Sequence, residues 1–143
     1  MHTHIVFSTK NSQPVLDAPL RPHLYNYMAG ILRKLECNSI TIGGIEDHVH
    51  IGCAITKKHA PMNVVATLKK ESSKWLKTQA SHLKYFHWQD GYGLFSVSPT
   101  HIPQLNRYIE NQFEHHKRED FKEELLRLLS INGIVFNEKY LWD

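Results

Sequence analysis

Two histidines separated by one residue are the first feature of this sequence that could do chemistry. His48 and His50 lie within a β-rich run. Because alternate residues of a strand share a face, we expect the two imidazoles side by side and Val49 turned to the core. Such a pair suits two ligands of one metal ion. The alternative is two histidines on a half-exposed strand. Asp47 could support the pair as a carboxylate, but we favour a turn residue.

A tyrosine and a glutamine four residues apart form the second feature. In a helix, residues four apart lie on one side, one turn from each other. We expect Tyr108, Gln112 and His115 on one stripe, beside an apolar stripe that faces the core and contains Ile102, Leu105, Ile109 and Phe113. Tyr108 could then be a nucleophile and Gln112 a metal ligand. The alternative places Tyr108 at the edge of the core.

Two further patterns could bind nucleic acid. Aromatic residues alternate with glycines between Trp88 and Val97, so that Trp88 and Tyr92 could stack on bases. The alternative is a tight turn with aromatic core residues. A set of lysines on or near one helix could neutralise phosphates or form an ordinary solvated face; it contains Lys57, Lys58, Lys70, Lys74, Lys77 and Lys84.

Hydrophobic periodicity predicts the elements that position these residues. Strands are expected at 4–9, 39–45, 48–55 and 94–97, and helices at 17–35, 61–79, 100–117 and 121–130. Asp17 is the expected N-cap of the first helix, with Pro19 in its first turn. The apolar tail 134–143 is expected to pack on the sheet edge or on a partner.

The order of these elements predicts an α+β fold in a single domain, residues 1–143. It matches a ferredoxin-like antiparallel sheet with helices on one face, followed by C-terminal helices that carry the tyrosine. The other face of such a sheet would be free for a substrate.

Composition sets bounds on function. With 17 Lys+Arg and 14 Asp+Glu the net charge is +3, which is compatible with a nucleic-acid partner without requiring one. No apolar run is long enough for a membrane span, and no signal peptide is evident, so we expect a cytoplasmic protein without a membrane partner. Cys37 and Cys53 are expected to be reduced core residues.

The ordered set of motifs resembles the single-tyrosine HUH transposases, which include the smallest bacterial insertion-sequence transposases and their REP-associated relatives. In these proteins two histidines flank a hydrophobic residue, here Val49. The resemblance covers nearly the whole chain: 4–10, 43–45, 48–50, 91–93, 95–97, 108–112, 115–116 and 140–142.

The resemblance implies a DNA transposase that cuts and rejoins single-stranded DNA with hairpin-forming ends. Tyr108 would be the nucleophile that forms a 5′-phosphotyrosine link, and His48, His50 and Gln112 would hold one Mg²⁺ or Mn²⁺. It also implies a homodimer, in which the tyrosine often reaches the opposite subunit's histidines. The base that takes the phenol proton is not identified; His115 is one candidate, and it is also a candidate DNA contact.

Two other functional classes remain open. A non-catalytic, domesticated nucleic-acid-binding module on the same fold would bind DNA or RNA without a covalent adduct. A zinc hydrolase or structural zinc domain could use His48 and His50, but no Cys-x-x-Cys or glutamate-containing zinc signature accompanies them.

Overall fold

A split β-α-β arrangement forms the body of the protein. The computed structural model describes residues 1–133, so the predictions made for the tail 134–143 lie outside the described residues. The elements in chain order are β1 (His2–Ser8), a 3₁₀ turn (Lys10–Ser12), α1 (Arg21–Lys34), β2 (Asn38–Ile45), β3 (His48–Ala54), α2 (Pro61–Leu76), a 3₁₀ turn (Ser81–Leu83), β4 (Gly93–Ser96), a 3₁₀ turn (Pro99–His101), α3 (Ile102–Glu110), α4 (Gln112–His115) and α5 (Phe121–Ile131).

The four strands form one antiparallel sheet in the order β2-β3-β1-β4. This is the ferredoxin-like order, so the predicted fold class is confirmed. Within the sheet, His50 lies opposite Val6 on β1 and opposite Gly43 on β2. Residues opposite one another share a face, so these positions surround the histidine pair.

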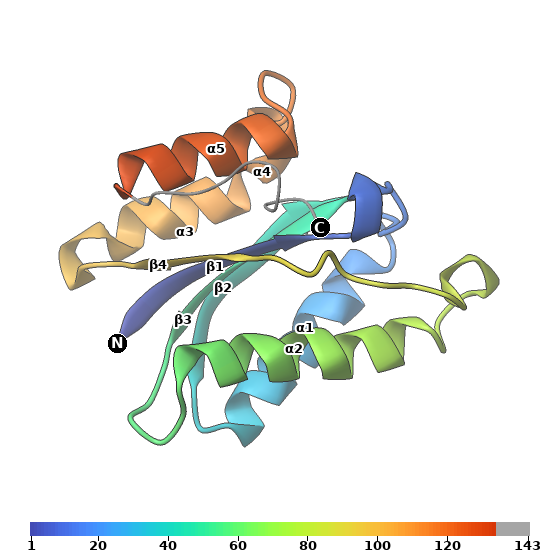
Figure 1. The fold of residues 1–143 in the computed structure, drawn as a ribbon, viewed down its shortest axis with the longest axis horizontal. Helices are drawn as coiled ribbons and strands as arrows, with labels where there is room; N and C mark the ends of the chain where they lie inside the picture. The colour runs from blue at the N-terminus through green and yellow to red at the C-terminus, as the bar shows by residue number, and fades with distance from the viewer. Residues whose placement is uncertain (134–143) are drawn as a thin grey trace.

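The main core lies on the face of the sheet that α1 and α2 cover (Figure 1). Alternate residues of the central strands, including Ile5, Phe7, Val49 and Ile51, are fully buried there. Burial of each such side chain contributes about 1.5–3 kcal/mol. The prediction that Val49 turns to the core is therefore confirmed, and the histidines on either side of it must point the opposite way.

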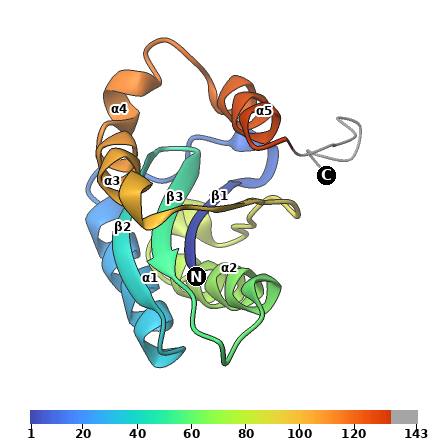
Figure 2. The same ribbon diagram turned by 90° about the vertical axis from the view of Figure 1, so that its left-hand side faces the viewer.

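The opposite face is not free, contrary to our expectation. Helices α3, α4 and α5 lie over it, as Figures 1 and 2 show from two directions. A second apolar cluster joins the sheet to α5 and consists of Val6, Phe95, Phe121, Leu125 and Leu129. The C-terminal helices thus enclose the surface that carries the histidine pair, because the apolar stripe of α5 has to be buried against something.

The first helix begins later than predicted. It starts at Arg21 with Leu20 as its N-cap residue and Pro22 in its first turn. Asp17 does not cap it with its side chain; instead, the Asp17 backbone carbonyl accepts hydrogen bonds from the amides of Leu20 and Arg21. The residues 17–20 therefore form a separate turn ahead of the helix.

The predicted helix 100–117 is broken at Asn111 into α3 and α4. The break turns Gln112 inward, where it is 1% exposed, and leaves Phe113 64% exposed. The assignment of Phe113 to the apolar stripe was wrong for this reason. Neither proline nor glycine marks the break, and the buried contacts of Gln112 described below hold it.

Two smaller predictions concern the cysteines and the membrane. Cys37 and Cys53 are buried and unpaired, as expected of reduced core residues. Among the helices within residues 1–133, none combines the length and apolar character needed to cross a bilayer.

Gly43 allows α3 to lie close to the sheet. A Cβ atom at this position would lie 2.7 Å from the backbone oxygen of Ile109 on α3. We predict that Gly43→Ala lowers the free energy of unfolding by about 1–3 kcal/mol, since backbone would have to move to admit the methyl group. Urea-induced unfolding followed by circular dichroism measures the change.

Gly30→Ala is the matched control. Gly30 lies inside α1 with nothing within 4 Å of an added Cβ. This substitution should raise stability by about 0.5–1 kcal/mol, because alanine loses less backbone entropy in a helix. Equal unfolding midpoints for the two variants would contradict the close approach of α3 at Gly43.

Candidate active site and metal centre

The paired histidines lie side by side in the interior, as the strand spacing predicts. Both side chains are fully buried, and their ring centroids are 5.0 Å apart. They project from β3 toward α3, α4 and α5. The alternative, two histidines on a half-exposed strand, does not describe them.

Gln112 reaches the same point from α4. Its Oε1 lies 3.0 Å from Nε2 of His48, and its Nε2 donates hydrogen bonds to Glu124 and to the backbone oxygen of Tyr108. The structure thus brings the predicted amide ligand to the predicted imidazole pair.

Tyr108 approaches the pair from α3. Its ring centroid is 5.6 Å from that of His50. Its hydroxyl donates a hydrogen bond to Oε2 of Glu124 and accepts one of 2.8 Å from Nη2 of Arg127. The predicted nucleophile and the predicted metal ligands therefore converge within one chain. Tyr108 also lines an open depression of about 310 Å³, together with Arg107, Asn111 and His115.

Glu124 of α5 is the centre of this group, and the sequence interpretation missed it. Its carboxylate is fully buried. Oε1 lies 2.9 Å from Nε2 of His50, 3.0 Å from Nε2 of His116 and 3.3 Å from Nε2 of His48. One signal was present: Glu124 falls on the apolar stripe of α5, with Phe121 and Leu125, where a carboxylate has to be paired.

The two adjacent histidines after α3 have different roles. The side chain of His116 is 5% exposed, and its ring lies 4.4 Å from that of His48. His115 is more exposed, and its Nε2 lies 2.8 Å from Glu119. Its ring is 5.2 Å from that of Tyr108, but its hydrogen bond is with Glu119. His115 therefore lies near Tyr108, but its role as the base stays a prediction.

The Nδ1 atoms of the paired imidazoles also have hydrogen-bond partners. Nδ1 of His48 lies 2.7 Å from Oδ1 of Asp47, and Nδ1 of His50 lies 2.8 Å from Nε2 of His4. Asp47 is in the turn, as expected, but it also has the supporting role that we had not favoured. These bonds fix both rings with Nε2 directed at the site, as is usual for histidines that bind metals.

The charges at the site follow from burial and hydrogen bonding. Burial opposes ionisation of Glu124, but hydrogen bonds from His116, His48 and His50 hold its pKa far below the usual range. Burial lowers the pKa of His50 to about 4. Burial opposes protonation of His48 too, but bonds with Asp47 and Glu124 raise its pKa to about 9.

Tyr108 is held in its neutral form. Burial, reinforced by the adjacent Glu124 carboxylate, raises the pKa of its hydroxyl above the usual value, and Arg127 acts in the opposite direction. Attack by this phenol therefore requires that positive charge be brought close to it.

The donor set fits a divalent cation. Four residues, His48, His50, His116 and Glu124, each offer one ligand atom, and these atoms lie within 4.8 Å of one another. For bonds of about 2.1 Å, neighbouring ligand atoms lie about 3.0–3.4 Å apart. The separations from Glu124 Oε1 to the three imidazole nitrogens span 2.9–3.3 Å. Gln112 Oε1, 3.0 Å from His48, extends the set.

Comparison with known proteins identifies the family. Residues 1–112 match the family model for IS200-like transposases, and this range includes the paired histidines, Tyr108 and Gln112. The chain belongs to the IS200-like transposase family. No curated protein matches the sequence.

Two solved structures are similar to this transposase. A predicted transposase from Deinococcus radiodurans R1 is 25% identical, with a TM-score of 0.65 over 78% of this chain and 90% of the other. A REP-associated tyrosine transposase bound to a REP hairpin is 13% identical, with a TM-score of 0.62 over 80% of this chain and 67% of the other. The second likeness shows the fold alone.

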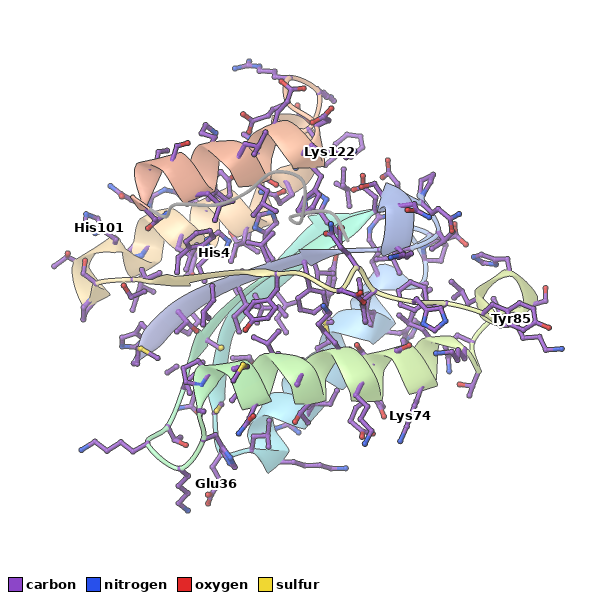
Figure 3. All side chains as sticks on the ribbon, viewed as in Figure 1. His4, Glu36, Lys74, Tyr85, His101 and Lys122 are labelled. Atoms are coloured by element: carbon purple, nitrogen blue, oxygen red, sulfur yellow. The ribbon has the colours of Figure 1, made fainter. Side chains whose placement is uncertain are left out.

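The lysines predicted to contact DNA lie away from the candidate metal site of this transposase. Lys70, Lys74 and Lys77 are on or directly after α2, across the sheet from α3 and α5, and Figure 3 shows Lys74 pointing away from the sheet while His4 lies on its other side. Lys58 forms an ion pair with Glu36, and Lys57 is exposed in the loop before α2. DNA binding by these lysines stays a prediction.

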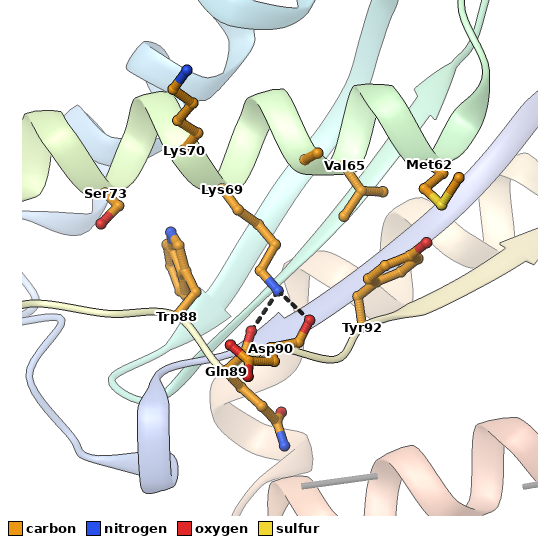
Figure 4. A pocket seen from close by; sticks show the side chains of 10 residues that line it. Met62, Val65, Lys69, Lys70, Ser73, Trp88, Gln89, Asp90 and Tyr92 are labelled. Atoms are coloured by element: carbon orange, nitrogen blue, oxygen red, sulfur yellow. Dashed lines mark hydrogen bonds between the residues drawn. The ribbon is translucent and has the colours of Figure 1, made fainter. Parts of the chain in front are cut away.

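The aromatic residues before β4 line a cavity of about 400 Å³ beside α2 (Figure 4). Trp88 is only 6% exposed, packs against Phe7 and donates a hydrogen bond to Ser72, so the alternative, a core residue, describes it better. Tyr92 is partly exposed at the cavity. The Lys69 ammonium reaches in and binds backbone carbonyls of residues 89–91.

Asp47 provides a test of the supporting bonds. We predict that Asp47→Ala weakens Mn²⁺ binding by about 10- to 100-fold, because His48 loses the partner that orients its ring and increases its basicity. Isothermal titration calorimetry on the metal-free protein measures the affinity. Asp90→Ala, in the loop beside Lys69, is the charge-matched control and should bind Mn²⁺ as the unmodified protein does; equal affinities for all three proteins would contradict the role of Asp47.

Proposed function

We propose that this transposase cleaves and rejoins single-stranded DNA through a covalent link to Tyr108, in a metal-dependent reaction. The observation that carries the proposal is the convergence of the Tyr108 hydroxyl with the cluster of His48, His50 and Gln112 inside one chain. A tyrosine at the edge of a core would not need a buried carboxylate and a guanidinium on its hydroxyl.

The proposed step is an in-line displacement at phosphorus. The Tyr108 oxygen forms a bond to the phosphorus atom and the P–O3′ bond breaks. The phenol proton passes to a base or to water, and the departing 3′ oxygen takes up a proton from water. A bound Mg²⁺ or Mn²⁺ would offset the negative charge of the phosphate and orient it. The resulting 5′-phosphotyrosine conserves the energy of the broken bond, so a 3′-hydroxyl can rejoin the strand.

Arg127 is well placed to assist Tyr108. Its guanidinium donates to the phenol oxygen, so it favours the phenolate as the proton leaves. Two bonds of about 3.1 Å from Arg127 Nε and Nη2 to Glu119 hold it in this orientation. The depression beside Tyr108, with Arg107 on its wall, offers a path for the phosphate.

The DNA partner and the assembly are also proposals. We infer a substrate with hairpin-forming ends, supported by the relative that was solved with a REP hairpin. We further propose a homodimer acting in the cytoplasm, with one tyrosine for each end of an element. Because Tyr108 lies beside His50 of the same chain, we propose a site that uses the tyrosine of its own subunit.

The decisive test is formation of a covalent adduct. We predict that the protein incubated with Mn²⁺ and a labelled single-stranded hairpin oligonucleotide gives a DNA-linked species on a denaturing gel. Tyr108→Phe should abolish it, since the nucleophilic oxygen is removed, and His48→Ala or His50→Ala should reduce it strongly. Tyr92→Phe is the control and should leave it intact.

Each alternative predicts another pattern. A non-catalytic module would bind the hairpin equally well with and without the Tyr108→Phe substitution and would give no adduct in either case. A zinc hydrolase would cleave without an adduct and would retain activity in Tyr108→Phe. An adduct that persists in Tyr108→Phe would mean that another residue is the nucleophile.

Arg127 allows a graded test of the same step. We predict that Arg127→Gln slows adduct formation by about 10-fold, equivalent to about 1.5 kcal/mol for a lost charge-assisted hydrogen bond. Single-turnover kinetics with the hairpin oligonucleotide measure the rate. Arg33→Gln on the exposed side of α1 removes the same charge and should have no effect; equal rates for both variants would exclude Arg127 from the reaction.

A further inference from the structure

Helix α5 and the segment before it contribute to the metal centre, although both lie beyond residues 1–112, which match the family. We infer that His116 and Glu124 are direct metal ligands, so that the ion is held by three imidazoles, one carboxylate and the Gln112 amide. This inference rests on the metal dependence proposed above and specifies which residues bind the ion.

Glu124 Oε1 is surrounded by more imidazole nitrogens than it can accept hydrogen bonds from. Three imidazole Nε2 atoms surround the single oxygen Oε1 at 2.9–3.3 Å. One carboxylate oxygen has two lone pairs, so it can accept about two hydrogen bonds in good geometry. A cation between these atoms would bind Glu124 Oε1 and all three Nε2 atoms at once.

The His48 ring is oriented with Nδ1 toward Asp47 and Nε2 toward Gln112 and Glu124. Its Nδ1 faces the Asp47 carboxylate, which can only accept, so the ring proton lies on that side. Its Nε2 then faces two oxygens, Gln112 Oε1 at 3.0 Å and Glu124 Oε1 at 3.3 Å. Without an ion, Nε2 can face these two oxygens only when the ring carries a second proton. A metal ion in the place of that proton would bind Nε2 and both oxygens.

The side chains of Glu124 and His116 are also removed from solvent. The side chain of Glu124 is fully buried and that of His116 is 5% exposed. Such groups are retained in an interior when they are paired or coordinate a metal. By contrast the nearby Glu119, bound to His115 and Arg127, is partly exposed and has no contact with His48 or His50 among its ion pairs.

This ligand set determines which ion is preferred. Mg²⁺ favours oxygen ligands and retains its waters, whereas imidazole-rich sites favour transition metals. The added carboxylate also lowers the net charge of the loaded site by one unit. Five protein ligands would leave an ion that takes six ligands able to bind a phosphate oxygen as well. We therefore expect Mn²⁺ to bind far more tightly than Mg²⁺.

The first test is metal binding by the protein alone, without DNA. Calorimetric titration of the metal-free chain with Mn²⁺ should show that Glu124→Gln and His116→Gln each weaken binding by more than about 100-fold, since loss even of supporting partners costs about 10- to 100-fold. Glu123→Gln, at the exposed neighbour of Glu124 on α5, is the matched control and should retain the unmodified affinity. Retained affinity in Glu124→Gln and His116→Gln would overturn the inference.

A second measurement uses the unmodified chain, so it does not depend on whether the variants fold. Pulsed electron paramagnetic resonance of Mn²⁺ in protein with ¹⁵N-labelled histidine should detect three coupled imidazole nitrogens. Two coupled nitrogens would assign the site to His48 and His50 without His116. Either failure would leave the adduct test at Tyr108 unaffected, so the inference and the proposed function can fail separately.

Discussion

A carboxylate buried without solvent must be surrounded by donors or cations, and this constraint organises the C-terminal half of the protein. Glu124 is fully buried, and its two oxygens contact four imidazoles, an amide and a phenol. Removal of one member would leave the others with uncompensated charge or polarity, at a cost of several kcal/mol. Helices α3, α4 and α5 therefore have to lie together over the sheet in one arrangement.

The sheet gives this arrangement its fixed frame. Because β3 alternates its side chains, the same strand supplies Val49 to the main core and the two imidazoles to the opposite face. The rigid core under α1 and α2 thus positions the candidate metal-binding atoms. The apolar contacts between α5 and Phe95 hold Glu124 above them. Catalytic groups on rigid elements are positioned more precisely than groups on loops.

The sequence was sufficient to predict the ferredoxin-like fold class and the helix pair on one face of the sheet, and its resemblance to a family implied the convergence of Tyr108 and Gln112 with the histidines. The elements themselves follow from periodicity, which is a local property. The break at Asn111 and the burial of Gln112 depend on contacts with residues far away in the chain, so no local signal indicated them. The position of α5 over the sheet could not be predicted for the same reason. The roles of Glu124 and Arg127 depend on that position, so they could not be predicted either. Glu124 on an apolar stripe was the one available hint.

The account as a whole depends on which atom of the protein becomes joined to DNA. The most direct measurement is mass spectrometry of the trapped complex after digestion with nuclease and trypsin. The account predicts that a 5′-linked nucleotide is found on the peptide 108–117, attached to the oxygen of Tyr108. A nucleotide on any other peptide, or complete recovery of this peptide without one from a reaction that has cleaved its DNA, would contradict it.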